Sequence, residues 1–259
     1  MNIWLLALII FSIAAIMTMS GRGGGNFYVV VLAITGFSMH EAATTGQFIL
    51  MLSSFFATIF FGKNKVVNLK LVLIIGSMTI VSAFLGGFLS EMFNDKFLRI
   101  VFAVFISLAA FLMLKPIRKE VNSEGRFILK LQSNNETYNL NLPLIVPIVL
   151  FTGFVSGMVG ISGGSFLVPL MVLLIRVPMK VAIGTSTALV MVSASSGFLG
   201  HLSSGHFDIK LAIPLAIGGI IGAIIGSKLT LKTKPKLLKI IFATTSLIAA
   251  LIMIYNVFL

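Results

Sequence analysis

The chain has 259 residues, of which 58% are hydrophobic and only 10% charged, and its mean hydropathy is +1.11. Water-soluble domains are about 45–50% apolar and roughly 25% charged. A soluble fold needs a polar surface, so this excess of apolar residues has to face lipid. The composition excludes an ordinary soluble domain and predicts an all-α polytopic membrane protein whose first partner is the lipid bilayer.

The charge balance and the cysteine count narrow the class further. The chain carries 19 Lys and Arg against 7 Asp and Glu, a formal net charge of +12, and no cysteine. In a membrane protein an excess of cations is typical of loops that orient the chain. No basic run is interleaved with aromatic residues, so no nucleic acid is expected as a partner. The missing thiols and the spacing of the histidines predict neither a metal site nor a cofactor.

Apolar stretches follow one another along the whole chain. They fall at 3–19, 27–39, 42–62, 69–90, 97–114, 144–160, 165–178, 181–203, 209–230 and 237–259. Most reach the roughly 20 residues that cross a bilayer as a helix. No Lys or Arg precedes 3–19, so we read it as a retained segment and not as a cleaved signal peptide. The stretches 27–39 and 165–178 cover only about 20 Å each, and each follows a glycine-rich break, which is typical of broken or re-entrant helices.

A polar interval separates the stretches into two sets of five. Within residues 115–142, apolar and polar residues alternate on both sides of Ser133-Asn134-Asn135-Glu136, a sequence that favours a turn. We therefore expect a β-hairpin in a linker outside the membrane, between a first membrane repeat at 1–114 and a second at 143–259.

The two sets match each other in sequence. Residues 37–114 align with 177–254 without a gap, so that Thr45 meets Thr185 and Gly86 meets Gly226. With a shift of one residue, the break at 21–27 aligns with the break at 160–166. Shared glycines, lysines and threonines in one register are improbable in unrelated apolar segments. The chain is therefore predicted to contain two homologous halves.

The positions of the cations predict how the halves are oriented. If the stretches cross in alternation, all but three of the 19 Lys and Arg lie on one side; the exceptions are Lys96, Arg99 and Lys210. Cationic loops collect in the cytoplasm. We expect inverted repeats, with both termini outside and the linker in the cytoplasm. The abundance of Lys, Ile and Asn suggests an AT-rich bacterial genome, and hence the plasma (inner) membrane of a bacterium.

The glycine breaks are the first candidate site. Matched interruptions in inverted repeats are typical of secondary transporters, with the substrate held between the halves. Glycine lets the backbone approach a ligand, and a helix start offers N–H groups to an anion. The candidate ligands are Arg22, Gly23, Gly24, Gly25 and Asn26 in the first break and Ser162, Gly163, Gly164 and Ser165 in the second. An arginine at membrane depth would supply charge; near the cytoplasmic interface, Arg22 would only be a topology signal.

Hydroxyl and amide side chains open the segment after each short stretch. Thr45, Gln47, Thr185 and Ser186 are candidates to bind substrate oxygens. Helix capping or close helix packing would account for any one hydroxyl, but the set recurs in both halves beside the glycine breaks, which favours binding. His40 and Glu41, just upstream, are candidates to carry a coupling ion if they lie inside the membrane. At the outer surface they would be ordinary interface residues.

These motifs resemble the sulfite exporter TauE/SafE family. The residues that carry the resemblance are Gly160-Ile161-Ser162-Gly163-Gly164-Ser165-Phe166-Leu167-Val168-Pro169 and Ala182-Ile183-Gly184-Thr185-Ser186, with first-half echoes at 21–27 and 42–46. The first half departs from the pattern, with Val30 at the position of Pro169 and Gly46 at that of Ser186. The resemblance implies a transporter of small sulfur-containing anions such as sulfite or organosulfonates, which works without ATP, by alternating access, coupled to an ion gradient. A homodimer is compatible with it.

Two other functions fit parts of the sequence. A passive anion channel shares every feature above. An intramembrane serine protease would use Ser162, in a G-x-S-G string, with His201 or His206 as base. The first-half break has Gly23 where the second has Ser162, so the repeated feature is glycine backbone and not a nucleophile. We therefore expect a transporter and not an enzyme.

Overall fold

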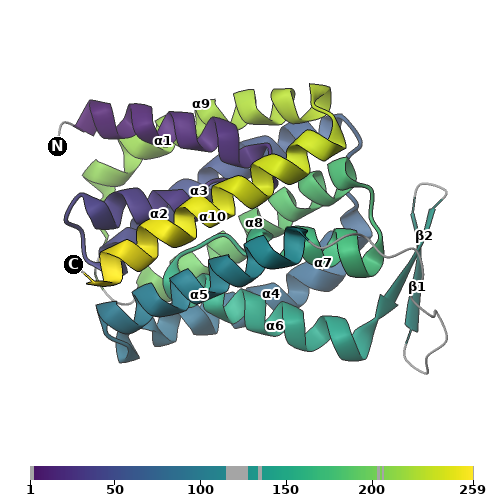
Figure 1. Ribbon diagram of the computed structural model, residues 1–259, viewed down its shortest axis with the longest axis horizontal. Helices are drawn as coiled ribbons and strands as arrows, with labels where there is room; N and C mark the ends of the chain where they lie inside the picture. The colour runs from purple at the N-terminus through teal and green to yellow at the C-terminus, as the bar shows by residue number, and fades with distance from the viewer. Residues whose placement is uncertain (1–2, 115–127, 134–135, 203–204, 206, 259) are drawn as a thin grey trace.

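The computed structural model describes residues 3–114, 128–133, 136–202, 205 and 207–258, and it is almost entirely helical (Figure 1). The first half contains α1 Ile3–Thr18, α2 Gly25–Ile34, α3 Met39–Lys63, α4 Leu69–Leu89, a 3-10 turn η1 Ser90–Met92 and α5 Asp95–Leu114. The second contains α6 Leu142–Val159, α7 Gly164–Leu170, a π-helical turn η2 Met171–Ile175, α8 Met179–Leu202, α9 Ile209–Lys232 and α10 Pro235–Phe258.

The helices form a bundle built for a lipid environment. In the described ranges, six helices are long and apolar enough to cross a membrane: Met39–Lys63, Leu69–Met92, Leu142–Val159, Met179–Leu202, Ile209–Lys232 and Pro235–Ile252. Large apolar side chains also cover the outer faces; Trp4 and Leu73 are each 72% exposed. Such a surface is stable in lipid and not in water. The predicted all-α polytopic membrane fold is confirmed.

Local sequence signals set the helix boundaries. Ser38 and Glu41 form a capping box at the start of α3, in which each side chain bonds to the other residue's backbone N–H. Asn68 and Asp208 cap α4 and α9 through their side-chain oxygens. Gly160, in the left-handed conformation, ends α6. These caps satisfy backbone groups that a helix end would otherwise leave unpaired.

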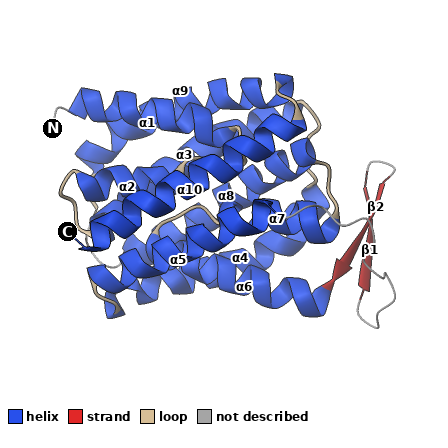
Figure 2. Ribbon diagram, in the orientation of Figure 1, coloured by secondary structure: helices blue, strands red, loops and turns tan. Residues whose placement is uncertain are grey.

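The polar interval between the halves contains an antiparallel pair of strands, β1 Ile128–Ser133 and β2 Glu136–Asn141 (Figure 2). Leu131 pairs with Tyr138, and both are buried in an apolar cluster that includes residues of η2. The hairpin lies at the end of the bundle opposite to the start of α1 and the end of α10 (Figure 1). We call these two ends the hairpin end and the terminal end.

Helix contacts pair the two halves in a regular way. The main contacts join α1 with α9, α6 with α4, α3 with α8 and α5 with α10. Helices α1 to α5 of the first half correspond in order to α6 to α10 of the second. If each helix is exchanged with its counterpart, the same four pairs result. In Figure 1, α1 starts at the terminal end and α6 starts beside the hairpin. The inverted repeats that the charge pattern predicts stay a prediction.

Glycines at matched positions allow the closest crossings. A Cβ built on Gly86 of α4 would collide with the carbonyl of Phe154 in α6, and one built on Gly226 of α9 would collide with the carbonyl of Ala15 in α1. Gly86 and Gly226 are matched residues of the repeat. Small residues let helix backbones approach closely in membranes, where packing and not water exclusion drives association.

Candidate functional site

The two glycine breaks separate short helices from the helices before them. Gly21, Gly23 and Gly24 have φ values of 76°, 65° and 98° between α1 and α2, and Gly160 has a φ of 74° between α6 and α7. Residues with a Cβ rarely adopt these left-handed conformations, so the breaks depend on glycine. The residues at the N-cap positions of α2 and α7 are Gly24 and Gly163, which have no side chain to cap the helix.

The breaks meet each other inside the bundle. Asn26 donates from its amide nitrogen to Ser165 Oγ at 2.7 Å, and the backbone N–H of Ser162 donates to Asn26 Oδ1 at 3.1 Å. A Cβ on Gly25 would lie 3.1 Å from the nitrogen of Ser162. The structure thus brings four sequence-predicted site residues together, and each belongs to the start of a short helix or to the break before it.

Arg22 lies in the first break and is fully buried. Its Nε donates to Ser20 Oγ at 3.0 Å, and its terminal nitrogens donate to the hydroxyls of Thr245 and Ser246. The guanidinium carbon also lies 4.3 Å from the centre of the Phe242 ring. Within the described residues no carboxylate forms an ion pair with Arg22. Its described partners are three hydroxyl oxygens, the sulfur of Met17 and the face of the Phe242 ring, none of which carries a negative charge.

Thr245 and Ser246 lie near the middle of α10, so the guanidinium contacts the centre of a membrane-length helix and not its end. These two hydroxyls are not among the site residues predicted from the sequence. A signal existed, because Thr244-Thr245-Ser246 interrupts an otherwise apolar stretch. The matched residues of the other half are Ile161 for Arg22 and Phe105 and Ile106 for the two hydroxyls, and all three are buried in one apolar cluster.

The hydroxyl and amide candidates contact the breaks in different ways. Ser186 donates to the carbonyl of Gly21 at 2.9 Å, and Gln47 donates from Nε2 to the carbonyl of Ser156 at 3.0 Å. Thr185 accepts the backbone N–H of Asn68, away from both breaks, at 2.9 Å. Of these three candidates, Ser186 alone bonds directly to a break residue.

Unpartnered polar atoms lie near the breaks. Gln47 Oε1 and Ser54 Oγ are buried and form no hydrogen bond with any described residue. Ser54 Oγ lies 2.6 Å from the position that a Cβ on Gly23 would take. Beside the second break, the hydroxyls of Ser156 and Ser193 lie 3.4 and 3.6 Å from the corresponding position on Gly163. Polar atoms therefore lie beside Gly23 in the first break and Gly163 in the second, in the space that a side chain at either position would enter.

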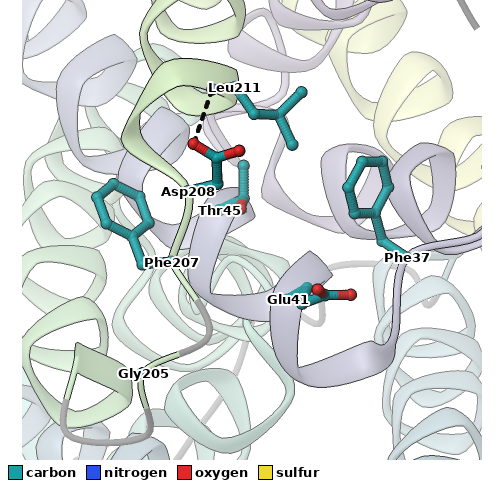
Figure 3. A pocket seen from close by; sticks show the side chains of 7 residues that line it. All are labelled: Phe37, Glu41, Thr45, Gly205, Phe207, Asp208 and Leu211. Carbon is teal, nitrogen blue, oxygen red and sulfur yellow. Dashed lines mark hydrogen bonds between the residues drawn. The ribbon is translucent and has the colours of Figure 1, made fainter.

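Two cavities open near the candidates. One, of about 200 Å³, is lined by Phe37, Glu41, Thr45, Gly205, Phe207, Asp208 and Leu211 at the terminal end (Figure 3). In Figure 3, Phe37 and Phe207 lie on opposite sides of it, with Thr45 and Glu41 between them. The second, of about 580 Å³, has an almost wholly apolar lining on α3, α4 and α8 and suits hydrocarbon better than an anion. Arg22 lines neither cavity.

His40 and Glu41 lie at the start of α3. His40 pairs with Glu91 at 3.2 Å and with Asp95 at 3.7 Å, at the junction of η1 and α5. Glu41 accepts the N–H of Ser38 through one oxygen, and its side chain lines the cavity at the terminal end. Of the two coupling candidates, Glu41 faces a cavity and His40 is engaged by carboxylates.

The side chains that the protease hypothesis needs are engaged elsewhere. The ring of His201 bonds to Ser90 Oγ at 3.1 Å and to the carbonyl of Gly157 at 2.8 Å. Ser162 Oγ accepts the N–H of Gly164 at 3.2 Å. Ser162 therefore acts in the local turn and is not activated by His201. His206 lies outside the described residues.

Comparison with known proteins gives one consistent result. The family model described as "Sulfite exporter TauE/SafE" matches residues 6–253. The chain is 28% identical to "Probable membrane transporter protein YunE" of Bacillus subtilis over 83% of this chain and 81% of that protein. It is 25% identical to a "Probable membrane transporter protein" of Methanocaldococcus jannaschii over 93% and 91% of the two chains.

A second Bacillus subtilis relative, "Probable membrane transporter protein YdhB", is 24% identical over 97% of this chain and all of that protein. No solved structure matches the chain. The family match spans nearly every helix, the breaks included, and the family and its relatives are membrane transporters and not enzymes. The chain belongs to the sulfite exporter TauE/SafE family of membrane transporters.

Proposed function

We propose that this protein is a secondary transporter of a small oxyanion, of the sulfite or organosulfonate type, which binds between the two glycine breaks. The observation that carries the proposal is the buried Arg22, which no carboxylate of the described chain neutralises. A buried charge without a counter-charge is costly. An anion held beside it would remove that cost, so the site has a built-in preference for a negatively charged substrate.

The chemistry of the site fits an oxyanion. A guanidinium presents a planar fork of N–H groups that matches the oxygens of a carboxylate or a sulfonate. Thr245 and Ser246 each also donate to a carbonyl of their own helix, at 2.5 and 2.9 Å. They therefore remain hydrogen-bonded when Arg22 turns toward a ligand. We assign Arg22 the charge, and Asn26, Ser165 and Ser186 the hydrogen bonds to the substrate oxygens.

A carrier accounts for the closed site better than a channel does. Arg22 is fully buried. A passive channel needs a continuous path, whereas an alternating-access carrier passes through states in which its site is closed on one or both sides. We propose alternating access coupled to an ion gradient, with Glu41 as the coupling carboxylate because it lines the cavity at the terminal end.

The membrane orientation is part of the same proposal. We place the terminal end outside and the hairpin end in the cytoplasm of a bacterial plasma membrane. Support comes from the cations at the hairpin end, among them Lys63, Lys65 and the lysines near the junction of α9 and α10.

Uptake into proteoliposomes tests the function. Vesicles that contain the purified chain are expected to take up labelled sulfite or taurine saturably, and unlabelled substrate inside is expected to accelerate uptake by exchange. Arg22→Ala should abolish both activities. Lys228→Ala, which removes an exposed cation from α9, is the matched control and should leave them unchanged. Uptake without saturation or exchange would indicate a channel, and full activity in Arg22→Ala would remove Arg22 from the site.

A further inference from the structure

At the hairpin end, the start of α4 is docked on α8. Asn68 caps α4, and its backbone N–H donates to Thr185 Oγ1 at 2.9 Å. Asn68 is 3% exposed and Thr185 is fully buried. One turn away, the carbonyl of Val66 packs so closely on Gly184 that a Cβ there would collide with it. This end is closed between α8 and the start of α4.

The matched residues at the terminal end are not docked. The repeat aligns Thr45 with Thr185 and Asp208 with Asn68, and Asp208 caps α9 as Asn68 caps α4. Thr45 is buried, yet within the described part of the chain its hydroxyl forms no hydrogen bond. Asp208 is exposed, and both residues line the cavity of about 200 Å³ (Figure 3).

The difference between the two threonine pairs is local, because the contacts between the glycine breaks and the helices α3 and α8 are the same in both halves. A Cβ on Gly21 would meet the backbone of Ile183 in α8, and a Cβ on Gly160 would meet the backbone of Ala43 in α3. These two glycines are matched residues, and so are Ile183 and Ala43. Since α3 and α8 sit against the breaks alike, what distinguishes the two ends is whether the threonine holds the start of the facing helix.

Both residue pairs lie between the same two segments. The α3–α4 segment carries Thr45 at the terminal end of the bundle and Asn68 at the hairpin end, and the α8–α9 segment carries Asp208 at the terminal end and Thr185 at the hairpin end. The segments pack together through α3 with α8, α4 with α8 and α3 with α9. A rocking motion about this contact would bring one pair together as it separates the other.

We propose that Thr185–Asn68 and Thr45–Asp208 are the latches of two gates that close in turn, and that in this structure the latch at the hairpin end is closed and the latch at the terminal end is released. The proposal rests on the transport function above and extends it to the residues that control access. In the opposite state, the N–H of Asp208 donates to Thr45 Oγ1 and Asn68 is released from Thr185.

Introduced cysteines test the latches, since the chain has none of its own. Two double variants, Asn68→Cys with Thr185→Cys and Thr45→Cys with Asp208→Cys, are oxidised with copper phenanthroline in lipid vesicles. A disulfide forms only when the two Cα atoms come within about 7 Å. Both pairs are expected to cross-link, the first several-fold faster. Asn68→Cys with Asp208→Cys, which places one thiol at each end, is the control and should not.

The decisive variant carries all four cysteines. Each molecule should form one disulfide and keep two thiols that react with a maleimide mass tag, because closing one latch opens the other. Molecules with two disulfides would overturn the proposal. So would a Thr45→Cys, Asp208→Cys pair that never cross-links while the other pair does.

A single substitution at Thr185 also tests whether the two latches are coupled, without cysteines in the latch at the hairpin end. Thr185→Val removes the acceptor of the Asn68 N–H and keeps the volume of the side chain. Added to the Thr45→Cys, Asp208→Cys pair, it should speed cross-linking several-fold, because it favours the state in which that pair is closed. An unchanged or slower rate would contradict coupling between the latches.

The latch test is independent of the substrate. All steps are run without sulfite, which itself cleaves disulfides. If the two disulfides exclude each other but no sulfur oxyanion is taken up, the proposed substrate is wrong and the gates stand. If uptake is saturable but both disulfides form together, the gates are wrong and the transport function stands.

Discussion

Asn26 and Ser165 are 139 residues apart in the chain, yet the amide of Asn26 donates to the hydroxyl of Ser165 at 2.7 Å. Each is the second residue of the short helix in its own half, and the repeat aligns them with each other. The point where the breaks meet is therefore also the point where the two halves meet. A substrate bound there contacts both halves at once, which is what a carrier that moves one part against another requires.

Loss of this bond should weaken the whole bundle. Asn26→Ala removes the donor to Ser165 Oγ and the acceptor of the Ser162 N–H, and it leaves both of those groups buried. A buried polar group without a partner costs about 1–3 kcal/mol. We expect the thermal midpoint of detergent-purified protein to fall by several degrees. Asn64→Ala, which removes an exposed amide bonded only to Phe60, is the control; an equal loss in both variants would contradict a junction at Asn26.

Replacing Arg22 by an apolar residue should raise stability while it removes function. Arg22→Met fills similar space without the buried charge, and Thr245 and Ser246 remain bonded to their own helix. Apolar replacement of buried charges is often neutral or stabilising by about 1–4 kcal/mol. Thermal unfolding without ligand should show a midpoint equal to or above that of the unmodified chain. A midpoint lowered by several degrees would mean that Arg22 is a structural residue.

The matched helix crossings should be equally sensitive to an added methyl group. Gly86→Ala and Gly226→Ala each place a Cβ against a carbonyl of the facing helix. Overpacking of this kind costs about 1–3 kcal/mol. Gly62→Ala, at a helical position with nothing within 4 Å, should raise stability slightly. Thermal unfolding of the three variants checks this, and tolerance of alanine at Gly86 would show that α4 and α6 are not closely packed there.

Glu41→Gln separates ion coupling from substrate binding. Glutamine keeps an oxygen that can accept the Ser38 N–H, so the capping box and the start of α3 are preserved. If Glu41 carries the coupling charge, accumulation driven by an ion gradient should be lost while exchange of labelled for unlabelled substrate continues. Both rates are measured in the same proteoliposomes. Gradient-driven accumulation at the original level would exclude Glu41 as the coupling residue.

Much of the architecture follows from patterns that are local in sequence. Composition identifies the membrane class, and the lengths of the apolar stretches give the number of helices. Paired glycines locate both breaks because left-handed backbone strongly favours glycine, and Gly21, Gly23, Gly24 and Gly160 adopt it there. The expected hairpin region does contain β1 and β2. Helix boundaries are harder to predict: the short stretch expected at 27–39 forms α2 only over Gly25–Ile34, and no local pattern predicts the π-helical turn η2.

The partners of the site residues could not be predicted in the same way. The repeat alignment places Asn26 opposite Ser165 in sequence, but alignment does not tell which matched residues touch. Arg22 was expected to face the break, and its guanidinium instead contacts hydroxyls of α10. Those contacts depend on how α10 packs across the bundle, which no periodic pattern encodes. The sequence does show that the two halves differ at this site, because Arg22 and its two hydroxyl partners on α10 all have apolar counterparts in the other half.

The central claim is that Arg22 supplies the charge that holds the transported anion, and a calorimetric titration tests it most directly. Detergent-purified protein is titrated with sulfite, sulfate, thiosulfate, taurine, sulfoacetate and simple carboxylates, and the titrations are repeated with Arg22→Ala and with the control Lys228→Ala. We expect saturable binding of at least one sulfur oxyanion to the unmodified chain and to the control, and none to Arg22→Ala. Equal affinity of Arg22→Ala for the same anion would contradict it.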